Sequence, residues 1–139
     1  MAARVVIDAS VLLALVLREP HAEAVSELLD RWDTEGVELH APLLTQYEVA
    51  SALTRRRVRD GLSAEDASEA LAIIDALDVI FDLAPNNARA VEIAVELERH
   101  SAYDAVYLAL AERLNAEVWT LDGPLARNAS GRHPVRLID

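Results

Sequence analysis

Short apolar runs alternate along the chain with longer segments whose apolar residues recur every three or four positions. The short runs are rich in β-branched residues, which is typical of buried strands. These predicted strands cover residues 4–8, 37–41, 79–83 and 117–121, with a possible fifth at 135–138. The helical pattern covers residues 9–17, 21–32, 43–60, 64–77, 86–100 and 103–115. Strands and helices therefore alternate throughout, with no linker or repeat between them.

The helix ends carry ordinary start and stop signals. Pro20 follows the first helical segment, and Gly36 and Gly61 follow two others. The stretch SAED at residues 63–66 is a capping box that opens a further helix. Such alternation predicts an α/β fold, a three-layer α/β/α sandwich around a mainly parallel sheet of four to five strands, in one domain over residues 1–139. Ligands of such sheets bind beyond the carboxyl ends of the strands, near the point where strand order reverses.

Composition narrows the chemistry that this fold can carry. The 139 residues include no cysteine, which excludes disulfides and thiolate chemistry, and the four histidines lack the spacing of zinc ligands. All 13 basic residues are arginine, so reactions that need a lysine amine are excluded. The longest apolar run, residues 9–17, is too short to span a bilayer or to form a convincing signal peptide. We therefore expect a cytoplasmic protein that does not bind membranes.

Two acidic residues lie at the ends of predicted strands, and each has an ordinary structural explanation. Asp8 ends the first strand and suits the N-cap of the helix after it, a role worth about 1 kcal/mol. Asp122 follows the fourth strand and precedes Gly123-Pro124, a sequence typical of turns. Neither residue by itself indicates a functional site.

Two further acidic residues lie on predicted helices. Ser101 and Asp104 have the spacing of a capping box before an apolar helical run. Glu48 shares a helix face with Arg55 and Arg59, so it also fits a solvated stripe of charges. These explanations compete with a functional one for each residue.

The predicted topology favours the functional explanation, because it brings the four acids toward one edge of the sheet. Two like charges about 4 Å apart repel by about 4 kcal/mol at an effective dielectric constant near 20, so carboxylates gathered there need a cation. Carboxylate oxygens without Cys or His favour a hard cation such as Mg²⁺ or Mn²⁺. Such a site hydrolyses phosphodiesters by activating water and stabilising charge on the phosphate. The candidate catalytic and metal-binding residues are Asp8, Glu48, Asp104 and Asp122.

Several stretches in this order resemble a known family over essentially the whole chain. They are VVIDASVLLAL with Asp8, TQYEVASAL with Glu48, and SAYDAVYLALAERLNAEVWTLDGPLA with Asp104 and Asp122. No single piece is specific, but their joint order is similar to that of PIN-domain ribonucleases of the VapC toxin type. The resemblance implies a PIN-like fold and an Mg²⁺-dependent endoribonuclease, with Ser10 and Thr120 as supporting hydroxyls near the acids.

The same resemblance implies partners and products. Water would attack the RNA phosphate in line, leaving a 5′-phosphate and a 3′-hydroxyl without a covalent enzyme intermediate. The protein would be a homodimer and the toxin of a toxin–antitoxin pair, held inactive by a small cognate antitoxin protein.

The net charge of −11 argues against a nucleic-acid partner, because phosphate binding normally relies on a basic surface. A metal ion would lower the negative charge of the site, and the run TRRRVRDG supplies a local cluster of arginines. Arg55 and Arg59 lie along the face of Glu48, about 10 and 16 Å down the helix axis at 1.5 Å per residue, and are candidate RNA contacts. The alternative is a solvated helix end, where arginines are favoured by the helix dipole.

Other functions are less consistent with these residues. A receiver-like signalling domain needs a lysine, and a HAD-type phosphatase needs a second aspartate where Ser10 stands. Nucleotide-binding folds need glycine-rich loops, which the four scattered glycines do not form. The alternative that remains is a non-catalytic PIN-like module that binds RNA or protein, although the four filled acidic positions argue against it.

Overall fold

A computed structural model describes residues 3–139, which form five strands and seven helices. The strands are β1 (Arg4–Ile7), β2 (Glu38–Pro42), β3 (Ile80–Asp82), β4 (Glu117–Thr120) and β5 (Val135–Leu137). The helices are α1 (Ala9–Val16), α2 (Ala22–Glu35), α3 (Leu44–Asp60), α4 (Ala64–Ala76), α5 (Asn87–Glu96), α6 (Tyr103–Leu114) and α7 (Gly123–Ala129).

The strands form one parallel sheet in the order β3-β2-β1-β4-β5. The chain builds β1, β2 and β3 outward in one direction and then returns to place β4 on the other side of β1. The strand order therefore reverses between β1 and β4, which are paired with Ile7 beside Trp119. The carboxyl ends of both strands lie at this point, which is where α/β sheets commonly bind ligands.

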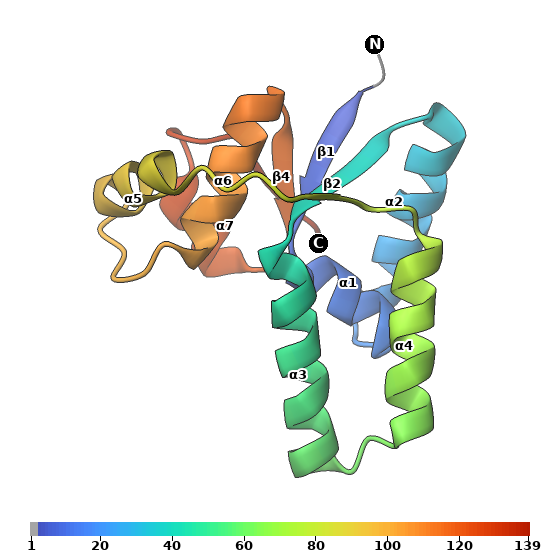
Figure 1. Cartoon of the computed structure of the whole chain (residues 1–139). Coiled ribbons are helices and arrows are strands. Elements are labelled where there is room, and N and C mark those ends of the chain that lie inside the picture. The colour runs from blue at the N-terminus through green and yellow to red at the C-terminus, as the bar shows by residue number, and fades with distance from the viewer. Residues whose placement is uncertain (1–2) are drawn as a thin grey trace.

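Helices cover both faces of the sheet and give the predicted three layers (Figure 1). Alternate residues of β1 point to opposite faces, so Val5 and Ile7 pack with α1, α2, α3 and α4, whereas Val6 packs with α5, α6 and α7. Both faces of the central strand are thus buried in aliphatic side chains. The predicted α/β/α class with a parallel sheet is confirmed.

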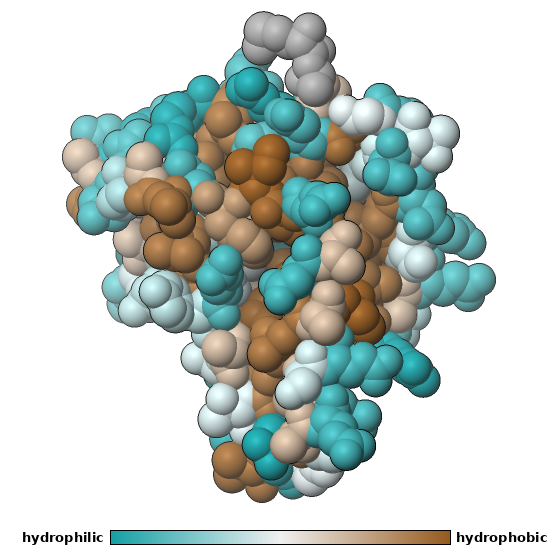
Figure 2. All heavy atoms as spheres, turned by 45° about the vertical axis from the view of Figure 1, so that its right-hand side comes forward, coloured by the Kyte–Doolittle hydropathy of each residue, from teal (hydrophilic) through white to brown (hydrophobic). Residues whose placement is uncertain are grey.

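The helices α3 and α4 run side by side and extend beyond the sheet as an antiparallel pair (Figure 1). Gly61 ends α3 in the left-handed conformation, with a φ of 69°, as the sequence predicts. Ser63 caps α4 by accepting a hydrogen bond from the backbone of Asp66, which confirms the predicted start of this helix. A groove between the two helices is lined in part by apolar side chains, including Leu71 and Phe81. Figure 2 shows apolar surface running between polar residues on one face of the molecule.

Two predictions differ most from the structure. The helix predicted over residues 86–100 ends at Glu96, because Glu98 adopts a left-handed φ of 56° and the Arg99 amide donates back to the carbonyl of Ala94. The turn predicted at Gly123-Pro124 is instead the first turn of α7, where the missing N–H of proline costs no hydrogen bond. No helix within residues 3–139 is long and apolar enough to cross a membrane.

Candidate active site

Asp8 lies at the reversal point, directly after β1, and its side chain is held by three hydrogen bonds. Its extended backbone places it at the N-cap of α1, where Oδ1 accepts from the Val11 amide at 3.4 Å. The Ser10 hydroxyl donates to Oδ1 and the Thr120 hydroxyl donates to Oδ2, each at 2.5 Å. Asp8 is only 8% exposed, so this carboxylate at the carboxyl end of β1 is almost completely shielded from water.

The two hydroxyls also tie the carboxyl ends of β1 and β4 to each other. Ser10 Oγ accepts from the Leu121 amide at 3.0 Å, and Thr120 Oγ1 accepts from the Asp122 amide at 2.9 Å. Asp122 in turn caps α7 by accepting from the Leu125 amide at 3.1 Å. Ser10 and Thr120 therefore lie beside Asp8, as the family resemblance implies. Asp122 is connected to Asp8 indirectly, through the hydrogen bond from its amide to Thr120.

Burial raises the pKa of Asp8 from its ordinary value of 3.8 to about 6. The hydrogen bonds from Ser10, Thr120 and Val11 lower the pKa and offset part of this effect, while the negative charge of Glu48 raises it further. An acid with a raised pKa is destabilised in its charged form by the folded protein. A cation bound beside Asp8 would relieve that cost.

This raised pKa predicts a pH dependence of stability without divalent metal. The contribution of Asp8 is fully present below about pH 4 and is lost as the pH rises through 6, because only the folded state disfavours the charge. A shift of about two pKa units corresponds to about 3 kcal/mol. In EDTA, we expect Asp8→Asn to unfold at higher urea than the wild type at pH 7.5, with the difference shrinking toward pH 4. A difference independent of pH would contradict this electrostatic account.

Glu48 approaches the same region from α3, which begins just after β2. The Tyr107 hydroxyl of α6 donates to Glu48 Oε1, and Thr45 Oγ1 lies 2.8 Å from the same tyrosine oxygen. Burial raises the pKa of Glu48 and the charge of Asp104 adds to this, whereas the hydrogen bond from Tyr107 opposes it. Burial and the bond to Glu48 also hold the pKa of Tyr107 well above its usual range, so the phenol remains a donor.

Asp104 lies in the first turn of α6, and its partner differs from the one that the sequence predicts. Ala102 is the N-cap residue and makes no side-chain cap, so the predicted capping box of Ser101 and Asp104 is wrong. Asp104 Oδ2 instead accepts from Arg99 at 2.6 Å. The left-handed turn after α5 places the arginine there. The helix therefore does not require Asp104 as a capping acid.

The candidate arginines differ in their surroundings. Arg55 lines a cleft of about 330 Å³ together with Glu48 and Ser51, whereas Arg59 lies one turn further along α3, outside that cleft. Neither guanidinium forms a hydrogen bond or ion pair within residues 3–139. Their neighbours in the arginine run have structural partners, since Arg56 pairs with Asp60 and Arg57 donates to the Leu62 carbonyl.

Comparison with known proteins places this geometry in a family. The model of the family described as the PIN domain matches residues 5–130. This chain belongs to the PIN domain family. It is 34% identical over 135 residues to a VapC ribonuclease of Mycobacterium bovis. The matched residues cover 96% of this chain and 98% of the relative. Ribonuclease VapC3 of Pyrobaculum aerophilum is 34% identical over 128 residues, covering 88% and 92% of the two chains.

Solved structures agree with the fold of this PIN domain. The crystal structure of a Pyrobaculum aerophilum protein superposes with a TM-score of 0.68 at 25% identity, covering 94% of this chain and 90% of the other. A toxin–antitoxin complex from Klebsiella pneumoniae gives a TM-score of 0.67 at 18% identity, covering 97% and 98%. At that identity, the second likeness supports the fold alone.

The donor chemistry of this PIN domain suits a hard divalent cation. Within residues 3–139, no three carboxylate or imidazole side chains are close enough together to form a metal site. Mg²⁺, however, is commonly held by only one or two carboxylates and completes its shell with water and substrate phosphate. The charge of Glu48 raises the pKa of Asp8, and the charge of Asp104 raises the pKa of Glu48, so these three acids lie within electrostatic reach of one another.

Sequence reasoning missed two residues that contact the candidate acids. Tyr107 lies one helical turn after Asp104 on α6, and its hydroxyl contacts both Glu48 and Thr45 of α3. Its place on the helix face next to Asp104 was the available signal. Arg99 carried no signal, because its contact with Asp104 depends on the left-handed turn that ends α5 early.

Proposed function

We propose that this PIN domain is an Mg²⁺- or Mn²⁺-dependent endoribonuclease that hydrolyses RNA phosphodiester bonds. The observation that carries the proposal is Asp8, a buried carboxylate at the reversal point of the sheet, oriented by Ser10 and Thr120 and within reach of the charge of Glu48. Its curated relatives over nearly the whole chain are named ribonucleases, which supports the same reaction. The proposed catalytic and metal-binding residues are Asp8, Glu48, Asp104 and Asp122.

A divalent cation at this site would supply Lewis acidity and lower the pKa of its water. Asp8 would hold it with the lone pair that remains on Oδ2, because a carboxylate offers about four acceptor positions and three are used. Glu48 Oε2 accepts no hydrogen bond within residues 3–139 and can take the proton of the attacking water. Attack on phosphorus breaks the P–O3′ bond, so the products carry a 5′-phosphate and a 3′-hydroxyl.

The arginines of α3 have a proposed role in binding the RNA backbone. Arg55 shares its cleft with Glu48, so a phosphate beside the scissile bond can reach its guanidinium. Arg59 continues the same helix face and would meet a more distant phosphate. These contacts offset the acidic net charge locally, where the substrate binds.

Removal of divalent metal provides the test of this function. We expect cleavage of a single-stranded RNA by the purified protein to stop in EDTA and to return when Mg²⁺ or Mn²⁺ is added in excess. Zn²⁺ serves as a comparison ion, because the site offers no thiolate or imidazole to favour it. RNA cleavage at an equal rate with and without EDTA would refute a metal-dependent nuclease, and binding without cleavage would favour a non-catalytic PIN-like module.

The resemblance to VapC toxins extends the proposal to the cell. We propose that the protein is a cytoplasmic toxin, acts as a homodimer and is inhibited by a small cognate antitoxin protein. Its expression should arrest growth, and co-expression of the adjacent small open reading frame should restore it. The Asp8→Asn variant is the matched control and should not arrest growth. Normal growth while active enzyme is present would remove the toxin assignment.

A further inference from the structure

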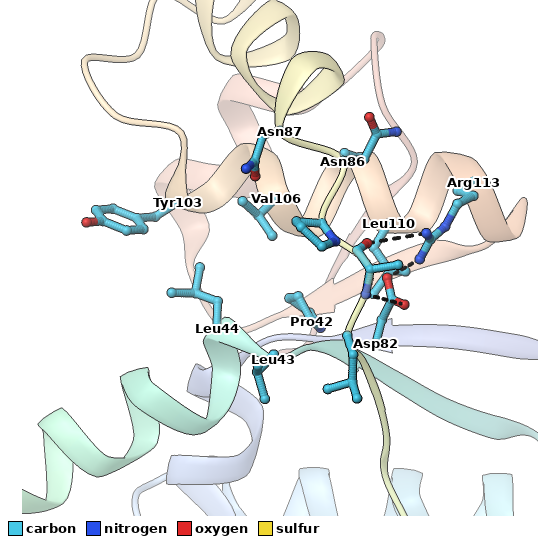
Figure 3. A pocket seen from close by; sticks show the side chains of 14 residues that line it. Pro42, Leu43, Leu44, Asp82, Asn86, Asn87, Tyr103, Val106, Leu110 and Arg113 are labelled. Atoms are coloured by element: carbon cyan, nitrogen blue, oxygen red, sulfur yellow. Dashed lines mark hydrogen bonds and ion pairs between the residues drawn. The ribbon is translucent and has the colours of Figure 1, made fainter.

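A second cleft, of about 290 Å³, lies beside the carboxyl ends of β2 and β3 and next to α6. Pro42, Leu44, Val106 and Leu110 give it a largely apolar lining (Figure 3). At one end of the cleft, Tyr103 and Leu44 lie on opposite sides of its opening, and at the other end lies Arg113. We call this cavity the α6 cleft.

The α6 cleft adjoins the cleft that is lined by Glu48 and Arg55. Tyr103 and Leu44 line both cavities, and the second of these cavities also contains Glu48 and Arg55. Tyr103 directly precedes Asp104 in the chain. An RNA strand bound across Glu48 would therefore pass the opening of the α6 cleft, where Tyr103 lies next to the proposed acid Asp104.

Two exposed aromatic rings lie where the RNA strand would pass Glu48. Tyr47 is 64% exposed and Tyr103 is 63% exposed, although aromatic residues make up only 4% of the chain. Both tyrosines line the cleft of Glu48 and Arg55. Exposed rings beside a phosphate-binding arginine are the combination by which proteins hold single strands, with bases stacked on the rings and the backbone beside the cation.

The polar groups of the α6 cleft suit an uncharged polar ligand. Asp82 is neutralised by an ion pair with Arg113, which also donates to the Ala84 carbonyl at 3.4 Å. Asn87 adds a carboxamide to the upper wall in Figure 3 and makes no side-chain hydrogen bond within residues 3–139. The side chain of Asn86 instead caps α5 by accepting from the Arg89 amide. An amide offers both a donor and an acceptor, as base edges require.

We infer that the α6 cleft is a subsite for one nucleobase of single-stranded RNA beside the cleavage position, with Tyr103 as the stacking platform at its mouth. The inference rests on the proposed ribonuclease function and adds to it a place where the base is held. A volume near 300 Å³ is at the small end of ligand pockets, so it suits a single planar ring system better than a helix of a partner protein. The apolar walls contact the ring faces, and the amide of Asn87 meets its edge.

Binding of a short single-stranded RNA to the Asp8→Asn protein, which keeps the strand intact, tests this subsite. With Mn²⁺ present, Tyr103→Ala should weaken binding roughly 5- to 150-fold, the range expected for loss of one base stack. Tyr103→Phe keeps the ring and should bind as its parent does. Val95→Ala removes a side chain that is 69% exposed on α5 and outside the cleft, and should change nothing. The slope of affinity against salt should be the same in all variants, because no phosphate contact is removed.

A second readout locates the base. RNA that carries 5-iodouridine should form its photochemical crosslink at Tyr103, and the crosslink should disappear in Tyr103→Ala. Unchanged RNA affinity in Tyr103→Ala would overturn the inference. So would a change from dimer to monomer at unchanged affinity per site, since the cleft would then be an interface between copies of this chain. If the wild type cleaves no RNA, the proposed function fails as well; if it cleaves and Tyr103→Ala binds normally, only the subsite fails.

Discussion

Replacing Asp8 with asparagine should reduce metal-dependent RNA cleavage by at least about 100-fold, because loss of groups that merely orient metal ligands already costs 10- to 100-fold. The amide oxygen can still accept from the Val11 backbone, so the N-cap of α1 is kept and only the charge is lost. The measurement is the initial rate of cleavage at saturating Mg²⁺, together with a circular dichroism spectrum to confirm the fold.

Asp30→Asn is a suitable control for this substitution. Asp30 is an exposed acid on α2, away from the carboxyl ends of β1 and β4, so the same loss of one negative charge should leave cleavage unaltered. Cleavage by Asp8→Asn at the wild-type rate would show that Asp8 is only a helix cap. The pH dependence of stability described above separates the two roles independently of activity.

Asp104→Asn should also abolish cleavage, with a loss of similar size, if its carboxylate serves the metal or the attacking water. Arg99→Gln breaks the same ion pair from the other side and leaves the carboxylate in place. This ion pair is partly exposed and contributes at most about 1 kcal/mol, so neither substitution should unfold the protein. Parallel cleavage assays of the two variants, with their melting temperatures, make the comparison.

The two roles of Asp104 predict opposite patterns. A catalytic carboxylate gives an inactive Asp104→Asn and an Arg99→Gln that stays within a few-fold of the wild-type rate. A purely structural ion pair gives two variants with equal and small losses. The second pattern would remove Asp104 from the proposed active site.

Most of the fold could be predicted because its signals are local. Aliphatic strands, caps and glycine stops agree with one another at Gly61 and Ser63, where the structure shows the predicted helix end and cap. The predictions failed where one signal had two meanings. Gly123-Pro124 is equally compatible with a turn and with the start of a helix, and the apolar pattern of α5 continues past the left-handed residue Glu98 that ends it.

The candidate site could be predicted less completely, since its contacts join distant parts of the chain. The position of Asp8 after a buried strand is a local property, and Thr120 reaches it because β1 and β4 are neighbours at the reversal of strand order. The contact between Tyr107 and Glu48 depends instead on how α6 packs against α3, which no spacing along the chain reveals. Arg99 reaches Asp104 only through the shape of one turn.

Mapping the RNA ends produced by the purified protein tests the central claim most directly. Total RNA would be incubated with wild type and with Asp8→Asn, each in Mg²⁺ and in EDTA, and new ends would be sequenced by a ligation that requires a 5′-phosphate. We predict discrete new 5′-phosphate and 3′-hydroxyl ends only with wild type and Mg²⁺. Ends that bear 2′,3′-cyclic phosphates, or the same ends in all four reactions, would contradict metal-dependent hydrolysis at the site built around Asp8.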